Sequence, residues 1–196
     1  MEQEANSEAR ERVLEAAARL FGQRGYTVVT LRDIAAEVGI RHTSLYHHAP
    51  GGKEDLFVEV TERSLKRHRD GLNQAMNSAG PHIRAQLCAA AGWLLSQPPM
   101  DLIRMVYTDM PAINPAQAGR LSLMAYESML LPIQNALDGA RARGEIGHNN
   151  LGLVAGGLMG MVESIHSVPS YAVTTTRAEM ACDLIDVMLD GLRVRA

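Results

Sequence analysis

The side chains best suited to binding phosphates and base edges gather in one stretch of the chain. Positions 38–53 contain no aspartate or glutamate, and they hold Arg41, Lys53 and the histidines His42, His47 and His48. Lysine and arginine neutralise the phosphates of DNA, and arginine can also donate two parallel hydrogen bonds to guanine. A surface built from these residues would therefore suit a nucleic acid.

The composition of the whole chain argues the other way. Its 196 residues carry 19 Lys and Arg against 22 Asp and Glu, which gives a net charge of −3. Recognition depends on where the charges lie rather than on their sum, and many of the acids lie near the N-terminus, at positions 2, 4, 8, 11 and 15. The acid-free stretch therefore keeps nucleic acid as a candidate partner.

The elements around this stretch have the spacing of a helix-turn-helix. Thr30 and Asp33 are three positions apart, as in a capping box, which predicts a short helix over 31–38. Gly39 supplies the positive φ of a sharp turn before a second short helix over 42–48. The small core between them is expected to contain Ile34, Val38, Ile40 and Leu45. With Leu45 turned inward, the side chains that face a major groove are Arg41, His42, Ser44, His47 and His48. A helical hairpin with no role in DNA binding is the alternative.

The rest of the chain also has the pattern of helices. An apolar stripe that ends at Gly25 predicts the first helix, and the Pro-Gly-Gly sequence at 50–52 separates the hairpin from a long helix over 53–76. Further helices are expected over 81–96, 101–110, 116–143, 149–166 and 176–193, with a kink at Pro132. No segment alternates with the period of a strand. We therefore predict an all-α fold of about nine helices.

Residues 12–56 contain one ordered set of characteristic residues: Arg12, Val13, Leu14, Ala16, Ala17, Leu20, Phe21, Gly25, Tyr26, Thr30, Ile34, Ala35, Val38, Gly39, Ile40, Ser44, Leu45, Tyr46, His47, His48, Lys53, Glu54, Asp55 and Leu56. In this set the chain resembles the DNA-binding domain of the TetR/AcrR family of bacterial transcription regulators. The resemblance implies a three-helix DNA-binding domain over 1–56, joined by a long helix to a ligand-binding and dimerisation domain over 57–196. It also implies a repressor that binds a palindromic DNA operator as a homodimer and is released by a small-molecule inducer.

The resemblance assigns roles to individual positions of the first domain. Thr30, Tyr46, His47 and Lys53 would contact the sugar-phosphate backbone, and packing against the first helix is the alternative for Tyr46. Bases would be read by Arg41, His42, Thr43 and Ser44. The chain departs from the family pattern at Arg41, where Ser or Thr is usual, at Ala49, where Phe is common, and by one extra residue before Lys53.

The second domain is expected to bind the inducer. All but one of the 11 methionines lie beyond residue 70, and their flexible thioethers suit varied apolar ligands. The predicted ligand-binding residues are Trp93, Arg104, Met105, Tyr107, Met124, Tyr126, Met159, Glu163 and His166. Ordinary core packing is the alternative for the methionines. Glu163 and His166 have the spacing of half a di-metal site whose other half is absent, so we expect neither a metal nor a cofactor.

Small residues predict a close helix contact near the C-terminus. Gly152, Gly156 and Gly160 recur every four residues, which permits a second helix to approach closely. Together with Leu184 and Met188 on the last helix, they could form a four-helix interface with a second copy of the chain. Close packing within one chain is the alternative for the glycines.

The cysteines, the N-terminus and the apolar stretches indicate the cellular compartment of the protein. Cys88 and Cys182 lie 94 positions apart and are expected to be reduced, buried thiols. The acidic N-terminus is unlike a signal peptide, and the longest uncharged apolar stretch, 151–162, is too short to cross a membrane, so a cytoplasmic protein is expected.

An α-helical enzyme or binding protein with an incidental hairpin is the alternative function, although no catalytic or phosphate-loop motif is visible.

Overall fold

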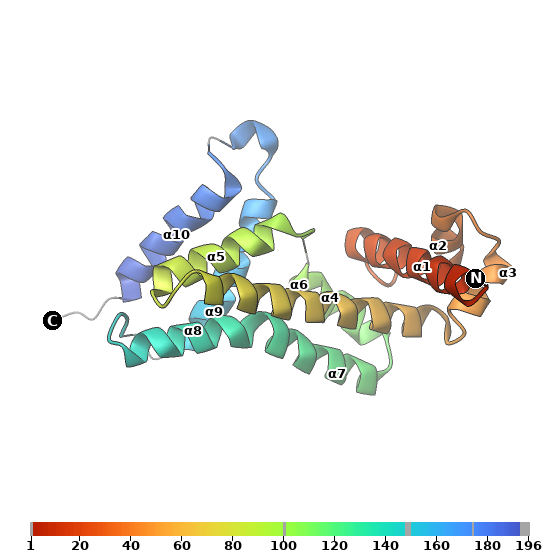
Figure 1. The fold of residues 1–196 in the computed structure, drawn as a ribbon, viewed down its shortest axis with the longest axis horizontal. Helices are drawn as coiled ribbons and strands as arrows, with labels where there is room; N and C mark the ends of the chain where they lie inside the picture. The colour runs from red at the N-terminus through yellow and green to blue at the C-terminus, as the bar shows by residue number, and fades with distance from the viewer. Residues whose placement is uncertain (1, 100, 148–149, 174, 193–196) are drawn as a thin grey trace. The chain divides into compact units, whose positions relative to one another are not determined.

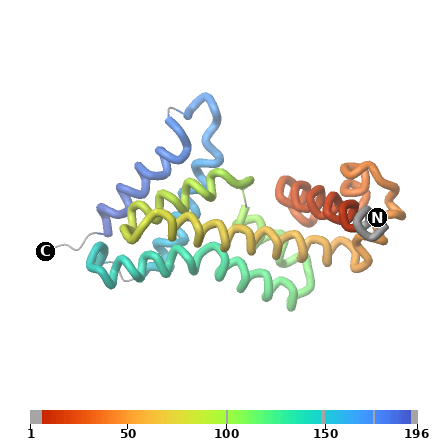
Figure 2. The backbone as a smooth tube through the Cα atoms, viewed as in Figure 1, coloured from red at the N-terminus to blue at the C-terminus, as the bar shows by residue number. Residues whose placement is uncertain are grey.

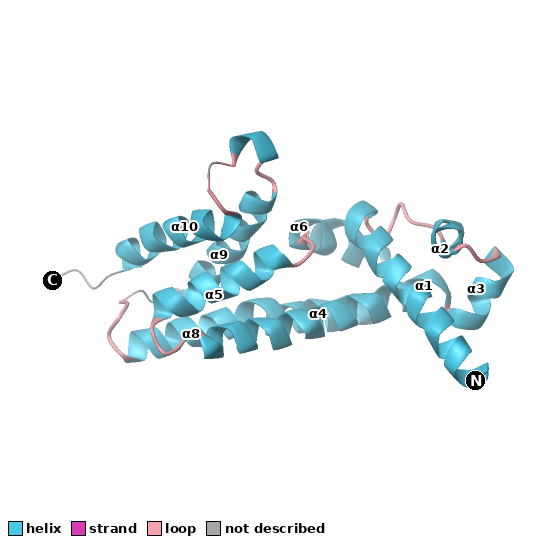
Figure 3. Cartoon of the chain, turned by 45° about the horizontal axis from the view of Figure 1, so that its top comes forward, coloured by secondary structure: helices cyan, strands magenta, loops and turns pink. Residues whose placement is uncertain are grey.

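The fold is all-α, as predicted. The computed structural model describes residues 2–99, 101–147, 150–173 and 175–192, with side chains from residue 7 onward. Figure 3 shows helices joined by loops, and none of the described residues forms a strand. Asn149 and Arg193, the first and last residues expected for two of the helices, lie outside these ranges.

The predicted number and positions of the helices are close to those found. In the N-terminal half they are α1 (Glu2–Arg24), α2 (Leu31–Val38), α3 (His42–His48), α4 (Gly52–Ser78) and α5 (Ile83–Ser96) (Figure 1). Next come α6 (Leu102–Arg104), η1 (Met105–Asp109) and η2 (Met110–Ala112), then α7 (Pro115–Ala125), η3 (Tyr126–Leu130) and α8 (Leu131–Ala142). The last are α9 (Leu151–His166), the short η4 (Ser170–Ala172) and α10 (Arg177–Leu192). Because α6–η2 and α7–α8 are each continuous in sequence, the described residues form nine longer helices and one short turn.

Both interruptions within these helices precede a proline. The π-helical turns η1 and η3 end at Asp109 and Leu130, two positions before Pro111 and Pro132. Proline has no N–H to donate and its ring crowds the carbonyl four residues earlier, so regular α-helical bonding cannot continue through it. A change of helix type is therefore found just before Pro132, and the kink expected there stays a prediction.

The described chain divides into two compact units. One contains the residues up to 64 together with 101–124, and the other contains 65–100 together with the residues from 125 onward. Two of the three boundaries fall inside α4 and α7, and the third separates α5 from α6. Figure 2 traces α4 as a single unbroken helix. The functional division at residues 56 and 57 stays a prediction.

The first unit has an aromatic core. Both phenylalanines of the chain lie in it: Phe21 and Phe57 are nearly perpendicular at 5.3 Å, and the Tyr26 ring is 4.9 Å from Phe57. The stripe predicted for α1 is buried beside them: Val13, Leu14, Ala17 and Leu20. Gly25 ends α1 with φ of +83°, a conformation that other residues adopt only with strain.

A polar clamp joins the segment 101–124 to the end of α1 within this unit. Arg104 donates from Nη2 to the carbonyls of Gly22 (2.6 Å) and Phe21 (3.2 Å), and its Nε lies 3.5 Å from Asp109 Oδ2. Asp109 is 3% exposed and accepts the backbone N–H of Tyr26 at 2.8 Å. These bonds satisfy helix-end carbonyls and a loop N–H that would otherwise lack partners. We call these contacts the α1 clamp.

The second unit is built around α5, α8, α9 and α10. Helix α5 packs along α10, and α8 packs on α9. From α4 it receives a stripe of buried residues three or four positions apart: Leu65, His68, Leu72 and Met76. His68 contacts the Trp93 ring edge-on at 5.3 Å.

The expectation of free, buried thiols is wrong. Cys88 of α5 and Cys182 of α10 form a disulfide, with Cα atoms 5.3 Å apart, and both residues are half-buried. The physical reason is that the two helices pack side by side with these positions facing each other, which no spacing along the sequence reveals.

None of the described helices combines the length and the apolar composition needed to cross a membrane.

Removing the Asp109 carboxylate should destabilise the first unit. Asp109→Ala leaves Arg104 without its counter-ion and the Tyr26 N–H without an acceptor, so we expect the free energy of unfolding to fall by about 3 kcal/mol. The control Asp138→Ala breaks an exposed pair with Arg141 and should cost less than about 1 kcal/mol. Urea unfolding of both variants measures the difference, and equal losses would contradict a structural role for the clamp.

Candidate nucleic-acid interface

Helix α2 begins with the capping box predicted from its sequence. The Asp33 N–H donates to Thr30 Oγ1 at 3.2 Å, and the Thr30 N–H donates back to Asp33 Oδ2 at 2.8 Å. The Thr30 hydroxyl also donates to the same carboxylate at 2.6 Å, and these bonds lower the pKa of Asp33. Thr30 therefore fixes the start of α2, while its phosphate contact stays a prediction.

The turn between α2 and α3 has the geometry that Gly39 makes possible. Gly39 lies in the left-handed region at φ of +76°, and its N–H donates to the Ala36 carbonyl at 3.2 Å. The next N–H, of Ile40, donates to Ala35 at 3.0 Å. Any side chain at position 39 would strain this conformation. The turn sends the chain into α3 after only three residues.

The small core predicted between the two helices is present. Ile34 and Leu45 are fully buried and Ala35 nearly so, whereas Val38 and Ile40 are half-buried at the rim. Arg41 stands at the start of α3 and makes no side-chain capping bond, in keeping with its departure from the Ser or Thr usual there. Its guanidinium therefore takes no part in capping the start of α3.

The opposite face of α3 carries the residues predicted to meet DNA. Arg41, Thr43 and His47 are exposed, and His42, Ser44 and His48 are half-buried. Tyr46 is 49% exposed, and the His42 ring meets it edge-on at 5.3 Å. Tyr46 thus has one ring contact on its own helix and keeps a large exposed surface.

Lys53 lies against Tyr26 at the start of α4. Its ammonium is 4.2 Å from the centroid of the Tyr26 ring, a cation–π contact, and 3.5 Å from the Thr27 carbonyl. Burial lowers the pKa of Lys53, and the charge of Asp109 opposes that shift. Burial also raises the pKa of Tyr26, with a further rise from the charge of Glu54. The one extra residue before Lys53 leaves the ammonium in contact with this ring.

Acidic residues of α1 and α4 are paired with arginines. Arg10 makes two bonds with Glu59 (3.0 and 2.7 Å), and Arg63 reaches Glu11 at 2.8 Å and Glu59 at 3.2 Å. The pKa of Glu59 is lowered, chiefly by its hydrogen bond to Arg10. These pairs join α1 to α4 and neutralise two of the carboxylates that would otherwise repel phosphates.

The predicted ligand-binding residues are divided between the two units. Arg104, Met105, Tyr107 and Met124 belong to the first, and Trp93, Tyr126, Met159, Glu163 and His166 to the second. Met105 is buried, Tyr107 is 78% exposed, and the hydroxyl of Tyr126 donates to Gln134 at 3.0 Å. Arg104 is held in the α1 clamp. The shared ligand role of the set stays a prediction.

The glycine stripe on α9 is not packed closely against any other described residue. A Cβ placed at Gly156, Gly157 or Gly160 would meet no atom within 4 Å, and one at Gly152 only the end of Gln134. Leu153 on the same helix and Leu184 and Val187 on α10 are exposed, while Met188 is half-buried. These glycines therefore do not support the alternative of close packing within one chain.

Sequence reasoning missed two buried polar residues, His68 and Asp109. His68 could have been found, because it continues the three-to-four spacing of Leu65 and Leu72, although charged neighbours mask that pattern. Asp109 and the Tyr26 N–H that it accepts gave no usable signal, since they lie 83 positions apart. Within the described residues, no three His, Cys, Asp or Glu side chains are grouped so as to hold a metal ion.

Comparison with known proteins identifies the N-terminal part of the chain. Residues 13–60 match the family model described as bacterial regulatory proteins, tetR family. The HTH-type transcriptional regulator LmrA of Bacillus subtilis strain 168 is 38% identical over 71 residues, which are 36% of this chain and 38% of LmrA. The chain spans less than half the length of the curated relatives that it matches.

Solved structures share the fold over nearly the whole chain. A transcriptional regulator of Saccharomonospora viridis in complex with choline has a TM-score of 0.73 at 22% identity, covering 96% of this chain and 100% of that one. AibR, solved with isovaleryl coenzyme A and operator DNA, has a TM-score of 0.72 at 19% identity, covering 94% and 97%. The matched family model and the curated relatives show that residues 13–60 are those of the tetR family of bacterial regulatory proteins, and the solved structures show a common fold over nearly the whole chain.

Proposed function

We propose that the chain is a ligand-responsive repressor of transcription that binds a palindromic DNA operator as a homodimer and is released by a small molecule. In this proposal residues 1–56 bind DNA, and residues 57–196 bind the ligand and form the dimer. Each copy places α3 in one of two successive major grooves. The match of residues 13–60 to the tetR family supports the regulatory role, and the alternative of an α-helical enzyme is set aside because the matched family consists of regulators.

The observation that carries the DNA-binding proposal is the outer face of α3. Leu45 is fully buried and fixes the rotation of the helix, so Arg41, Thr43 and His47 point away from the core. No acid lies between positions 38 and 53 to repel phosphates. The bases would be read by Arg41, His42, Thr43 and Ser44. The backbone would be held by Thr30, Tyr46, His47 and Lys53.

Ligand release is proposed to act through the α1 clamp. Met105, one of the predicted ligand residues, lies between Arg104 and Asp109 in sequence, and the clamp joins both of these to α1. A ligand that shifts this helical segment would therefore shift the end of α1 and the Tyr26 loop. Two buried polar atoms of the second unit, Ser128 Oγ and Gln86 Oε1, have no hydrogen-bond partner among the described residues, which supports a polar ligand group in this unit. The result would be a population shift toward dimers in which the spacing of the two DNA-binding domains no longer matches the operator.

The dimer is proposed to form through α9 and α10. The open stripe at Gly152, Gly156 and Gly160 lets a partner helix approach, and Leu184 and Met188 of α10 would lie beside it. Two exposed apolar side chains, Leu153 and Val187, extend the same pair of packed helices. Burial against a second copy would remove them from water.

Selection of bound DNA from a random pool, followed by a small-molecule release screen on the selected site, tests the function as a whole. The expected result is a palindromic site whose complex some molecules dissociate. Transcription in vitro with and without protein then separates a repressor from an activator of the same fold. Failure to select any sequence would overturn the proposal.

Loss of backbone contacts should weaken DNA binding without changing oligomeric state. For Lys53→Ala we expect the slope of log affinity against log salt to become shallower by about 0.9, the value for one phosphate contact. Tyr46→Ala should lower the affinity as well. Mobility-shift titrations at several salt concentrations measure both effects, with Lys66→Ala as the control for loss of an exposed lysine. Unchanged titrations for both variants would refute the assignment.

Arg41 should determine base preference. A bidentate arginine–guanine contact discriminates by about 1–3 kcal/mol, so Arg41→Ala should lower affinity for the selected site by about 5- to 150-fold. Repeating the DNA selection with the variant should show relaxed preference at one position in each half-site. Arg141→Ala removes the same charge from α8 and should bind normally. If Arg41→Ala retains both affinity and preference, Arg41 does not read a base.

A charge on α10 should dissociate the dimer. Val187 is 71% exposed, so Val187→Glu should not disturb the fold of one chain. Burying that carboxylate in the interface should raise the dimer dissociation constant about 100-fold or more. Leu123→Glu, on the exposed part of α7, is the matched control and should remain dimeric. Light scattering after size exclusion distinguishes them, and a dimeric Val187→Glu variant would place the interface elsewhere.

A further inference from the structure

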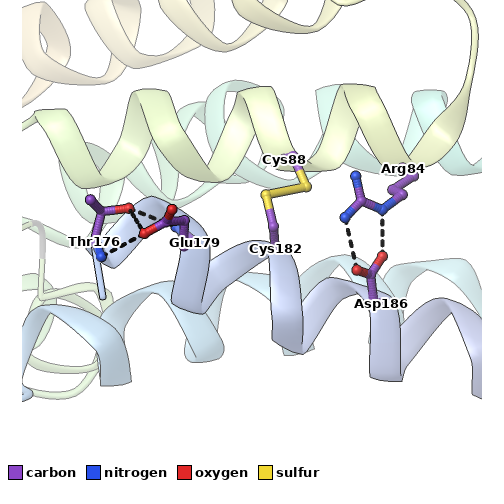
Figure 4. The surroundings of a disulfide bond; sticks show 6 residues. All are labelled: Arg84, Cys88, Thr176, Glu179, Cys182 and Asp186. Carbon is purple, nitrogen blue, oxygen red and sulfur yellow. Dashed lines mark hydrogen bonds and ion pairs between the residues drawn. A yellow bond between two sulfur atoms is a disulfide. The ribbon is translucent and has the colours of Figure 1, made fainter. Parts of the chain in front are cut away.

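Two helices of the second unit are joined by a covalent bond that the proposed function does not use. Cys88 and Cys182 are bonded, and one helical turn away Arg84 binds Asp186 with two hydrogen bonds of 2.6 and 2.8 Å (Figure 4). Arg84 precedes Cys88 whereas Asp186 follows Cys182, so α5 and α10 run antiparallel. The disulfide and the ion pair are therefore successive connections between the same two helices.

Contacts other than the disulfide also join the two helices. Leu87 and Ala91 of α5 and Ala181 and Ile185 of α10 are almost fully buried, and α10 starts with its own capping box, in which Thr176 and Glu179 exchange hydrogen bonds. Apolar burial and the Arg84–Asp186 pair would still hold α10 after reduction. A folded dithiol form is therefore physically reasonable, which is the first requirement of a reversible site.

The two cysteines lie at the margin of the core of the second unit. Both cysteines are half-buried rather than sealed in the core, and on α10 the neighbouring positions Asp183 and Leu184 are exposed. Leu184 belongs to the proposed dimer interface, whereas Cys182 contacts α5. The same helix thus carries the disulfide on one side and the proposed dimer contact on another.

We propose that Cys88 and Cys182 are a reversible dithiol–disulfide site, whose oxidation fixes α10 against α5 and thereby strengthens the dimer. The coupling to the dimer rests on the proposed function, whereas the redox site itself does not. Fixing α10 before association removes conformational freedom that would otherwise be lost on binding. The oxidised chain should therefore form the tighter dimer.

The oxidant is a low-molecular-weight disulfide. The thiolate of one cysteine attacks a sulfur of that disulfide, which forms a mixed disulfide and releases one small thiol. The second cysteine then attacks the protein sulfur of the mixed disulfide, which closes the Cys88–Cys182 bond and releases the second small thiol. The cysteine pair loses two electrons, the reagent gains them, and the two thiol protons leave on the released thiols.

The first test equilibrates the native full chain in mixtures of reduced and oxidised glutathione, traps free thiols by alkylation and counts them by mass spectrometry. We expect one reversible transition between two free thiols and none, without covalent dimers. Thiols that stay free in every mixture would overturn the site. So would a bond that resists excess reduced glutathione in the folded protein, because it would then be purely structural.

The second test compares dimer dissociation of the oxidised and reduced chain by sedimentation. Oxidation should lower the dissociation constant about threefold or more, and Cys88→Ser and Cys182→Ser should show no response to redox mixtures. If a serine variant does not fold, the alanine variant at the same position is used in its place. Equal dissociation of the two forms would overturn the coupling. A chain that is monomeric in both forms would refute the proposed dimer, while the thiol count still decides whether the pair is reversible.

Discussion

The arrangement of the first unit depends on one buried carboxylate. Asp109 accepts the N–H of Tyr26 and lies beside Arg104, which in turn binds the last carbonyls of α1. A carboxylate with so little exposure is tolerable only because a cation and a backbone donor compensate its loss of water. The Tyr26 ring that this loop positions is in contact with Phe57 and with the Lys53 ammonium. A displacement of the 101–124 segment therefore reaches both the aromatic core and a predicted phosphate contact.

Local signals explain why much of the fold was predictable. The Thr30 cap, the Gly39 turn and the inward position of Leu45 are each decided within a few residues, and the structure has all three. An interruption of the helix near Pro132 was predictable for the same reason, since proline acts on its own turn of helix. The outward residues of α3 then follow from Leu45 alone.

Contacts between distant segments could not be predicted from one sequence. Asp109 and Tyr26 meet across 83 positions, and Cys88 meets Cys182 across 94. Nothing in the local pattern of either pair marks it, because the pairing is decided by which helices pack together. Arg104 illustrates the same limit: its charge suggested a ligand contact, whereas its guanidinium binds the carbonyls of Phe21 and Gly22.

The π-helical turn before Pro132 has a consequence for how the chain can vary in length. Such a turn contains one residue more than the same stretch of α-helix needs, so a deletion within 126–130 can be absorbed by conversion to α-helix. Ile133 and Leu137 would then keep their buried orientation. A deletion in the middle of α5 would instead rotate every later residue by about 100°, carrying Leu94 out of the core. Homologues of different length are therefore expected to differ at η3 sooner than within α5.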